Sequence, residues 1–292
     1  MQRVDLVVID GQNDFLDPNG ALYVQGADKE AELLAAMIDR LGNKIFKIHA
    51  TLDSHHDIDI AHPQMWKDEN GNPPDPFTII TADEVRDRKW TCTLLGNFPG
   101  TTMSYHAKAL DYVEQLEGNG RYPLCIWPPH CLIGTPGHNI YPALRDAYES
   151  WINRRGQSPW INYVTKGDYP WSEHYSAIKA DVPDGNIPAT QINAPLLTTM
   201  AQADIIVWTG WAGSHCLANT GRDAVDYFDP PAGSPPEAKN EFIRKSVLLT
   251  DVCAPVQPDP PGTTMFTDMR DNFISEMESR GMKLSTTDQF LT

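Results

Sequence analysis

Short apolar runs alternate along this chain with segments in which apolar residues recur at helical spacing. Runs rich in β-branched residues, such as Val4–Ile9, are typical of strands that are buried on both faces of a sheet. The periodic segments are typical of amphipathic helices that pack against such a sheet. The pattern predicts strands at 4–9, 44–52, 160–164, 204–209 and 246–250, and helices at 29–41, 141–154, 217–228 and 266–280.

This alternation of strands and helices predicts an α/β fold with an open, mostly parallel central sheet and helices on both of its faces. In such folds, ligands bind beyond the carboxyl ends of the strands, near the point where the strand order reverses. Polar residues that directly follow the predicted strands are therefore the first candidates for a functional site.

Two stretches rich in proline and glycine interrupt the alternation, at 62–98 and at 229–239. We interpret both as loop insertions in a single domain that spans 1–292. Surface decoration is the simplest reading of each. For the first stretch we favour another interpretation, in which it forms a wall that covers the ligand site, because it directly follows candidate site residues.

The composition is that of a soluble globular protein, with 41% hydrophobic and 21% charged residues. The net charge of −16 argues against nucleic acid as a partner, because such a surface repels phosphates. No apolar run approaches the ~20 residues that cross a bilayer, and no secretory signal is visible, so a cytoplasmic protein is expected. The five cysteines are scattered without a CxxC pair, which indicates neither a disulfide framework nor a cysteine-rich zinc site.

Cys216 is the candidate nucleophile. It lies where a predicted strand ends and a helix begins, with Ser214 as the expected N-cap. The first turn of a helix stabilises a thiolate and lowers the thiol pKa, and its free N–H groups can hold an oxyanion. The alternative is a cysteine that only packs in the core.

Asp10 and Lys166 each follow a predicted strand and are the candidate partners of the thiol. A carboxylate at the end of a buried parallel strand lies at the ligand-binding edge, although an aspartate there can also cap a turn. A single lysine before a glycine is usually solvated surface. None of these three residues is persuasive by itself.

Asp53 and His55 are two positions apart at the end of a strand, so alternation directs both side chains to the same side. Together with His130 they provide one carboxylate and two imidazoles, which suit Zn²⁺, Fe²⁺ or Mn²⁺. His56 is expected to point away from the site. His62 lies nearby as a spare imidazole.

Set in order, these pieces resemble the nicotinamidase and isochorismatase-like cysteine hydrolase superfamily, over roughly residues 4–280. Five segments in the right order, each at a strand end or in an edge loop, carry the resemblance. They are DGQNDF at 10–15, LDSHH at 52–56, WPPHCLIGTPG at 127–137, TKG at 165–167 and GSHCLANTGRDA at 213–224. The strand that ends in LLTDVCA at 248–254 fits a late strand of the family.

The resemblance implies a three-layer α/β/α sandwich and a catalytic triad of Asp10, Lys166 and Cys216. It also implies an oxyanion hole formed by the backbone N–H groups of Ala212 and Cys216, with a cis peptide bond between Trp211 and Ala212. The positions match the motifs one by one.

The metal-dependent branch of the family further implies a divalent ion, with Zn²⁺ preferred and Fe²⁺ or Mn²⁺ as alternatives, held by Asp53, His55 and His130. An additional histidine is common in that branch, but the expected spacing falls on Ala61, with His62 one position later. His62 is therefore a possible further ligand.

The same branch implies aromatic side chains around a planar substrate. Phe15 and Trp127 match those positions, and Trp171 or Tyr175 is expected to close the pocket. The alternative for each is ordinary core packing. Cys131 follows His130 directly and is interpreted as structural, because it lacks the position at a helix start.

The leading hypothesis is a metal-dependent cysteine amidohydrolase that converts nicotinamide or a related small amide to its carboxylic acid and ammonia through a thioester. Two alternatives stay open. One is a metal-free isochorismatase-like or carbamoyl-amide hydrolase, and the other is an inactive binding or scaffold homologue. The expected partner is a small amide substrate, without nucleic acid or membrane, and relatives frequently form homo-oligomers.

Overall fold

The central sheet consists of parallel strands. The chain adds strands first on one side of the N-terminal strand and then on its other side. The structure is a computed structural model that describes residues 2–155, 160–234, 240–259 and 262–292. Within these residues, six strands pair in the order β10-β9-β8-β1-β2-β7, and every neighbouring pair is parallel. Their bounds are β1 Val4–Ile9, β2 Ile45–Asp53, β7 Asn162–Lys166, β8 Ile205–Gly210, β9 Ser246–Leu249 and β10 Lys283–Ser285.

The sheet confirms the strands expected from the apolar runs, with two differences. The strand expected at 160–164 is shifted to Asn162–Lys166, which puts Lys166 at its carboxyl end. The edge strand β10 was not predicted, because its three residues are exposed or half-buried and carry no apolar run.

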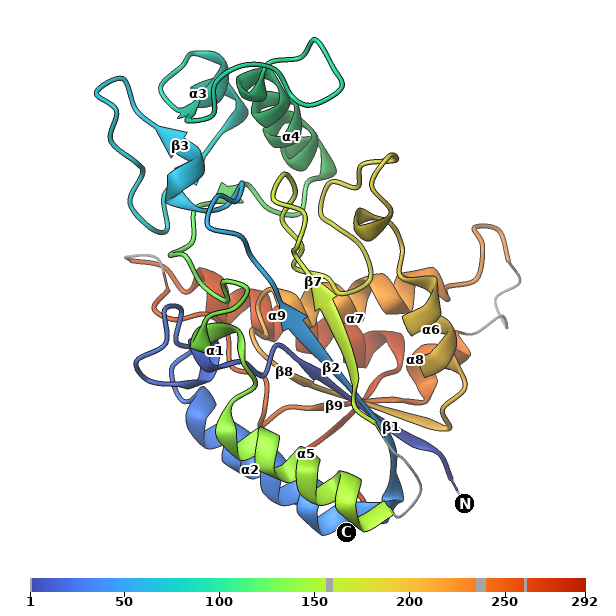
Figure 1. The fold of residues 1–292 in the computed structure, drawn as a ribbon. Helices are drawn as coiled ribbons and strands as arrows, with labels where there is room; N and C mark the ends of the chain where they lie inside the picture. The colour runs from blue at the N-terminus through green and yellow to red at the C-terminus, as the bar shows by residue number, and fades with distance from the viewer. Residues whose placement is uncertain (1, 156–159, 235–239, 260–261) are drawn as a thin grey trace.

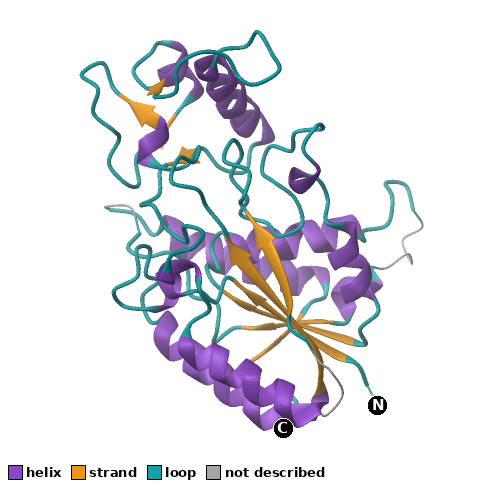
Figure 2. Ribbon diagram, in the orientation of Figure 1, coloured by secondary structure: helices purple, strands orange, loops and turns teal. Residues whose placement is uncertain are grey.

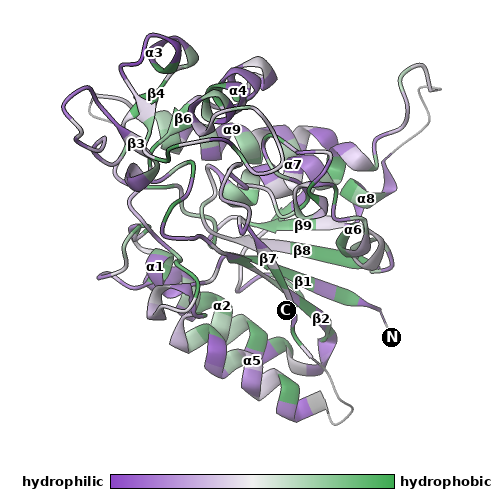
Figure 3. Ribbon diagram, turned by 45° about the horizontal axis from the view of Figure 1, so that its top comes forward, coloured by the Kyte–Doolittle hydropathy of each residue, from purple (hydrophilic) through white to green (hydrophobic). Residues whose placement is uncertain are grey.

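Helices cover both faces of the sheet, which confirms the expected three-layer α/β/α architecture. Figures 1 and 3 show α2 and α5 on one face and α6, α7, α8 and α9 on the other. The first pair packs side by side, and α7 contacts both β8 and α9. The bounds are α1 Asn13–Leu16, α2 Ala27–Leu41, α5 Pro142–Arg155, α6 Ala194–Ala201, α7 Cys216–Tyr227, α8 Glu241–Arg244 and α9 Met265–Arg280.

The long connection between β2 and β7 builds a small lobe beyond the carboxyl ends of the strands (Figures 1 and 2). We call residues 63–126 the cap lobe. It contains α3 Ala82–Arg86, α4 Tyr105–Asn119 and two short antiparallel pairs, β3 Trp66–Lys67 with β5 Thr91–Cys92 and β4 Ile79–Ile80 with β6 Leu124–Cys125. The insertion expected at 62–98 is thus part of a larger folded unit.

The second expected insertion, at 229–239, leads from α7 to α8. Residues 235–239 lie outside the described part of the chain, and 229–234 form a loop without a helix or strand. No described helix is long and apolar enough to cross a membrane.

The core is continuous from the sheet into both helical layers. All six residues of β1 are buried, in agreement with its uninterrupted apolar pattern. On the other side of β8, α7 approaches α9 closely at Gly221, where a Cβ atom would lie 2.9 Å from Cζ of the buried Phe273 ring. A small residue is therefore required at this crossing.

We expect Gly221→Ala to lower the free energy of unfolding by about 1–3 kcal/mol, because overpacking against Phe273 exceeds the gain in helix propensity. Gly118 in α4 is the matched control, since no atom lies within 4 Å of the place that an added methyl group would occupy, and Gly118→Ala should stabilise the helix. Urea unfolding of both variants measures the difference. Equal stabilisation of both would contradict the close helix crossing.

Candidate active site

Three adjacent strands bring Asp10, Asp53 and Lys166 together at one edge of the sheet. Asp10 directly follows β1, Asp53 ends β2, and Lys166 ends β7 in register with Asp53. The Lys166 Nζ atom lies 2.9 Å from Asp10 Oδ2 and 2.9 Å from Asp53 Oδ1. All three side chains are buried. The lysine is therefore a buried cation shared by two carboxylates.

Cys216 approaches this cluster from the neighbouring strand β8 through the turn that begins α7. Its Sγ atom lies 3.5 Å from Lys166 Nζ, and ligand atoms of Cys216, Asp10 and Asp53 lie within 4.8 Å of one another. The helix begins at Cys216, with His215 as the N-cap residue. Ser214 does not cap the helix as expected, because its hydroxyl accepts the N–H of Val256 and contacts His215 Nδ1 instead.

The pKa values of the charged residues move in different directions. Burial opposes the positive charge of Lys166, but Asp10 and Asp53 outweigh burial and raise its pKa well above the usual value. Burial also opposes the charge of Asp53, yet Lys166 and His55 hold its pKa well below the usual range. At Asp10, burial is the larger effect and raises the pKa. Asp10 is thus the carboxylate that more readily takes a proton.

Cys216 is not the preformed thiolate that its position at a helix start predicted. Burial raises the pKa of its thiol well above the usual value, and Lys166 offsets only part of that increase. Because Lys166 is already paired with two carboxylates, its charge is largely compensated before the sulfur is reached. The resting side chain is a thiol next to a proton acceptor.

Thr51 fixes the orientation of Asp10. The Thr51 hydroxyl donates to Asp10 Oδ1 at 2.5 Å and accepts the Asp10 backbone N–H at 2.9 Å. This leaves Asp10 Oδ2 on the side of Lys166. Asp10 itself has φ of 49°, in the left-handed region that non-glycine residues rarely occupy. The backbone therefore leaves the sheet abruptly at this carboxylate.

The turn between β8 and α7 presents two free backbone N–H groups next to the sulfur. Neither the Ala212 N–H nor the Cys216 N–H has a hydrogen-bond partner among the described residues. The peptide bond between Trp211 and Ala212 is cis, as the resemblance implied. Glu30 of α2, which sequence reasoning missed, holds this turn by accepting the Trp211 indole N–H at 2.7 Å and the Ala254 N–H at 3.1 Å.

Asp53 also faces a cluster of imidazoles on its other side. Its Oδ2 atom lies 3.2 Å from His55 Nε2 and 3.3 Å from His130 Nε2. The opposite ring nitrogens are fixed, since His55 Nδ1 lies 3.1 Å from Asp59 Oδ2 and His130 Nδ1 lies 2.8 Å from the Pro128 carbonyl. These partners direct both Nε2 atoms toward Asp53, an arrangement typical of histidines that bind metal.

His62 is the third imidazole of this cluster, and its surroundings suit a metal ligand. Its ring centroid lies 4.8 Å from that of His55 and 5.4 Å from that of His130. Both ring nitrogens are buried without a hydrogen-bond partner among the described residues. Burial, with smaller effects of His130 and His55, lowers the pKa of His62 to about 2, so the ring is neutral. Ligand atoms of the three imidazoles lie within 4.8 Å of one another, and the nitrogens of His62 are unpaired, so the cluster fits a divalent cation.

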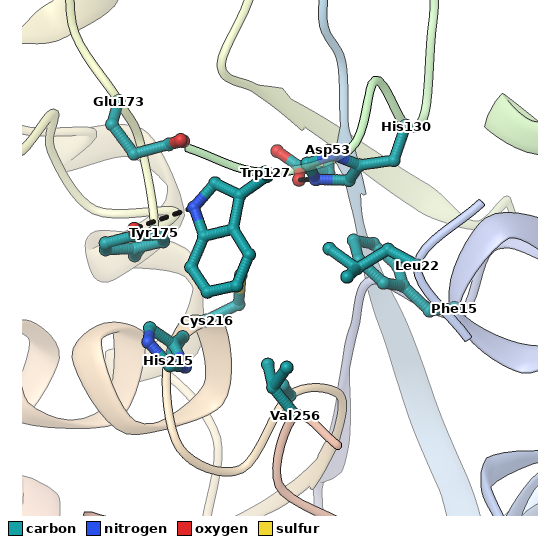
Figure 4. A pocket seen from close by; sticks show the side chains of 11 residues that line it. Phe15, Leu22, Asp53, Trp127, His130, Glu173, Tyr175, His215, Cys216 and Val256 are labelled. Atoms are coloured by element: carbon teal, nitrogen blue, oxygen red, sulfur yellow. Dashed lines mark hydrogen bonds and ion pairs between the residues drawn. The ribbon is translucent and has the colours of Figure 1, made fainter. Parts of the chain in front are cut away.

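A pocket of about 330 Å³ opens between the cysteine and this cluster (Figure 4). Cys216 lines this pocket together with Asp53 and His130. Aromatic and aliphatic side chains form most of the remaining wall. The lining residues are Phe15, Leu22, Asp53, Trp127, His130, Glu173, Tyr175, Ala212, His215, Cys216 and Val256.

Comparison with known proteins gives the same fold. No family model matches the chain. The sequence is 22% identical over 255 residues to the nicotinamidase of Saccharomyces cerevisiae, which covers 87% of this chain and 89% of that protein. The crystal structure of the yeast nicotinamidase bound to the inhibitor nicotinaldehyde matches with a TM-score of 0.61 at 18% identity, over 97% of this chain and 99% of that chain.

A second solved structure, the pyrazinamidase of Pyrococcus horikoshii in complex with zinc, matches with a TM-score of 0.51 at 18% identity, over 97% of this chain and 99% of that chain. The chain has the fold of the nicotinamidase and isochorismatase-like superfamily. This confirms the fold that the resemblance of the five sequence segments implied.

Within this superfamily fold, most of the expected pocket residues do line the pocket. Phe15, Trp127 and Tyr175 lie in its wall, and the Trp127 indole N–H donates to the Tyr175 hydroxyl at 2.9 Å. Trp171 does not line it. Its ring stacks on Tyr105 at 5.5 Å, because the loop after β7 packs there against the cap lobe.

Four further residues lie near the site, and the sequence analysis named two of them. His56 is exposed, and its Nε2 atom lies 3.1 Å from the Asp168 carbonyl oxygen, away from the cluster. Cys131 is buried, and its backbone N–H donates to Asp14 Oδ2 at 2.6 Å. Glu173 and His215 line the pocket without having been predicted, because no spacing marks a single polar residue in a loop.

We expect alkylation of Cys216 by iodoacetamide to be at least about tenfold slower at pH 7 than alkylation of a small free thiol, because burial raises its pKa. The rate should keep rising above pH 9. Cys216→Ala gives the background of the other cysteines, all of which are buried. A rate that reaches its plateau below pH 7 would show a thiolate and contradict this description.

Proposed function

We propose that this chain is a metal-dependent cysteine amidohydrolase that converts nicotinamide, or a related small planar amide, to the carboxylic acid and ammonia. The observation that carries the proposal is the contact of Cys216 Sγ with Lys166 Nζ at 3.5 Å, with Asp10 Oδ2 bound to the same ammonium. A nucleophile, a proton acceptor and a fixed cation therefore meet at one pocket. The yeast relative is a nicotinamidase, which supports the reaction class.

In this mechanism Asp10 takes the proton of the Cys216 thiol as the sulfur attacks the amide carbonyl carbon. The raised pKa of Asp10 suits it to accept a proton and to return it later. Lys166 stabilises the negative charge on sulfur while it forms. Because the thiol is protonated at rest, proton transfer accompanies attack rather than precedes it.

The tetrahedral intermediate carries a negative oxygen that the N–H groups of Ala212 and Cys216 can bind, since neither has a partner among the described residues. The protonated Asp10 gives its proton to the leaving nitrogen, the C–N bond breaks, and ammonia departs from a thioester on Cys216. Water then attacks the thioester carbonyl with Asp10 again as proton acceptor, and the carboxylic acid leaves as the thiol reforms.

Asp53, His55, His62 and His130 are the residues that would hold a divalent cation, with zinc preferred and iron or manganese as alternatives. The zinc complex of the Pyrococcus horikoshii relative supports the choice of ion. When bound, such an ion supplies a Lewis acid that takes a ring nitrogen or water as a ligand. Asp53 contributes one oxygen to this cluster and the other to Lys166.

The pocket suits a small planar ring. The pocket is small, which favours a single ring over a larger ligand. Phe15 and Leu22 form one wall, and Trp127 with Tyr175 forms the opposite wall (Figure 4). Aromatic walls bind flat heterocycles through stacking and edge contacts. The imidazole cluster favours this proposal over a metal-free hydrolase.

We expect the purified protein to release ammonia from nicotinamide and pyrazinamide at least about a hundredfold faster than from acetamide, as the aromatic pocket requires. Treatment with a chelator should remove stoichiometric metal, measured by elemental analysis, and lower the activity. Zinc, manganese or ferrous iron should restore it. Turnover of a carbamoyl compound or a vinyl ether instead, unaffected by chelator, would favour the metal-free alternative.

Replacement of Asp10 by asparagine removes the proton acceptor while keeping its shape, and we expect kcat/KM to fall by about 10²–10⁴. Thr51→Val is the matched comparison, because it keeps the Asp10 carboxyl group and removes the hydrogen bonds by which Thr51 orients it and lowers its pKa. Without those bonds the pKa of Asp10 rises, so the ascending limb of the pH–rate profile should move to higher pH. An Asp10→Asn enzyme with near-normal kcat/KM, or no ammonia release in any variant or the wild type, would contradict the mechanism.

A further inference from the structure

Glu173 lies in the loop after β7, and its backbone is fixed from two sides. Its N–H donates to the Tyr112 hydroxyl of the cap lobe at 3.2 Å, and its carbonyl accepts the Asp181 N–H at 2.9 Å. The preceding part of the loop is tied back to the strand end, since the Gly167 N–H donates to His174 Nδ1 at 3.0 Å. The position of the Glu173 side chain is therefore set by the fold.

The carboxyl group of Glu173 has only half of its hydrogen-bonding capacity satisfied. The residue is 4% exposed, and its Oε1 atom accepts the His174 N–H at 2.8 Å. Its Oε2 atom is buried and has no hydrogen-bond partner among the described residues. Leaving such a group unpaired is costly, so a buried polar atom in this state indicates a partner from outside the described residues.

The side chain that carries this unpaired oxygen belongs to the wall of the pocket. Glu173 lines the pocket, and Figure 4 shows its carboxyl group directed toward the side on which Trp127, Asp53 and His130 lie. Tyr175, the next lining residue along the loop, already has its hydroxyl oxygen engaged by Trp127. Burial raises the pKa of Glu173 to about 8, which shows how poorly its charge is compensated by this wall.

A second buried carboxylate with an unpaired oxygen differs from Glu173 in its charge compensation and in its distance from the pocket. Asp223 of α7 also has one buried oxygen without a partner among the described residues, but its other oxygen forms an ion pair with Arg121 at 2.6 Å. Asp223 does not line the pocket. Glu173 forms no ion pair with a basic side chain among the described residues, and its carboxyl group lies in the wall of the space that the substrate would fill.

We propose that Glu173 determines substrate specificity through a hydrogen bond between its unpaired Oε2 atom and a polar group on the ring of the substrate. The inference rests on the proposed function and narrows it. The preferred substrates are planar ring carboxamides that carry an amino or hydroxyl group on the edge that faces Glu173. A substrate with a methyl group there would leave the carboxyl group buried and unpaired, which lowers its transition-state binding.

The test compares kcat/KM for amino- and methyl-substituted pyridine-3-carboxamides, with the substituent at position 2, 5 or 6. At one position the wild-type ratio of amino to methyl should be at least about tenfold. Glu173→Gln keeps a donor and an acceptor and should retain this ratio within about threefold. Glu173→Met and Glu173→Leu keep the bulk but bind no polar group, so their ratios should fall at least tenfold below wild type.

Comparing ratios between variants cancels the electronic difference between the two substituents. Asp223→Asn is the matched control for loss of a buried carboxylate and should leave the ratio unchanged. Melting temperatures show whether each variant is folded. Two apolar variants are used so that the comparison can still be made if one of them does not fold.

The inference is overturned if either folded apolar variant keeps the wild-type ratio at all three positions, or if the wild type shows no preference. In that case nicotinamide turnover by the wild type still supports the proposed function. If the wild type hydrolyses none of these carboxamides, the proposed function itself fails, and the role of Glu173 fails with it.

Discussion

The site depends on the ion pairs that the ammonium group of Lys166 forms with two buried carboxylates. It lies 2.9 Å from a carboxylate oxygen of Asp10 and 2.9 Å from one of Asp53, and 3.5 Å from the Cys216 sulfur. Burial of one cation and two carboxylates is costly unless the geometry compensates it. The sheet provides that geometry, because β1, β2 and β7 are neighbours and end at the same edge. Removing the charge of Lys166 would leave two buried carboxyl groups with no cation between them.

This arrangement gives two similar carboxylates different properties. Asp10 contacts one cation through one oxygen and is raised in pKa by burial, so it can exchange a proton. Asp53 is held ionised by Lys166 and His55, and its second oxygen faces the imidazoles of His55 and His130. One carboxylate thus lies beside the thiol with a pKa suited to proton exchange, while the other joins the thiol to the imidazole cluster.

Much of the fold and the central part of the site could be predicted from the sequence. The uninterrupted apolar runs mark buried parallel strands, and the polar residues that follow them converge because the strands are parallel. The helix Tyr105–Asn119 of the cap lobe was not predicted. It follows the stretch rich in proline and glycine, which we interpreted as a loop insertion. The thiol pKa was predicted in the wrong direction, since the degree of burial of Cys216 and the pairing of Lys166 depend on tertiary structure.

Other site residues carry no local signal. His62 lies one position away from the spacing expected by resemblance, and its unpaired nitrogens are visible only once its neighbours are placed. Glu173 and Glu30 act through contacts with segments far away in sequence, the first through the pocket and the second through Trp211. Such residues are identified by the hydrogen bonds that they make or lack, which a sequence pattern does not encode.

The most direct test of the central claim is to quench the enzyme with acid during turnover of nicotinamide and to determine by peptide mass spectrometry which residue is acylated. We expect a nicotinoyl thioester on the peptide that contains Cys216, and we expect this acyl group to be absent in Cys216→Ala. An acyl group on another residue, such as Cys131, or hydrolysis without any acylated peptide in the steady state and in rapid-quench samples, would contradict it.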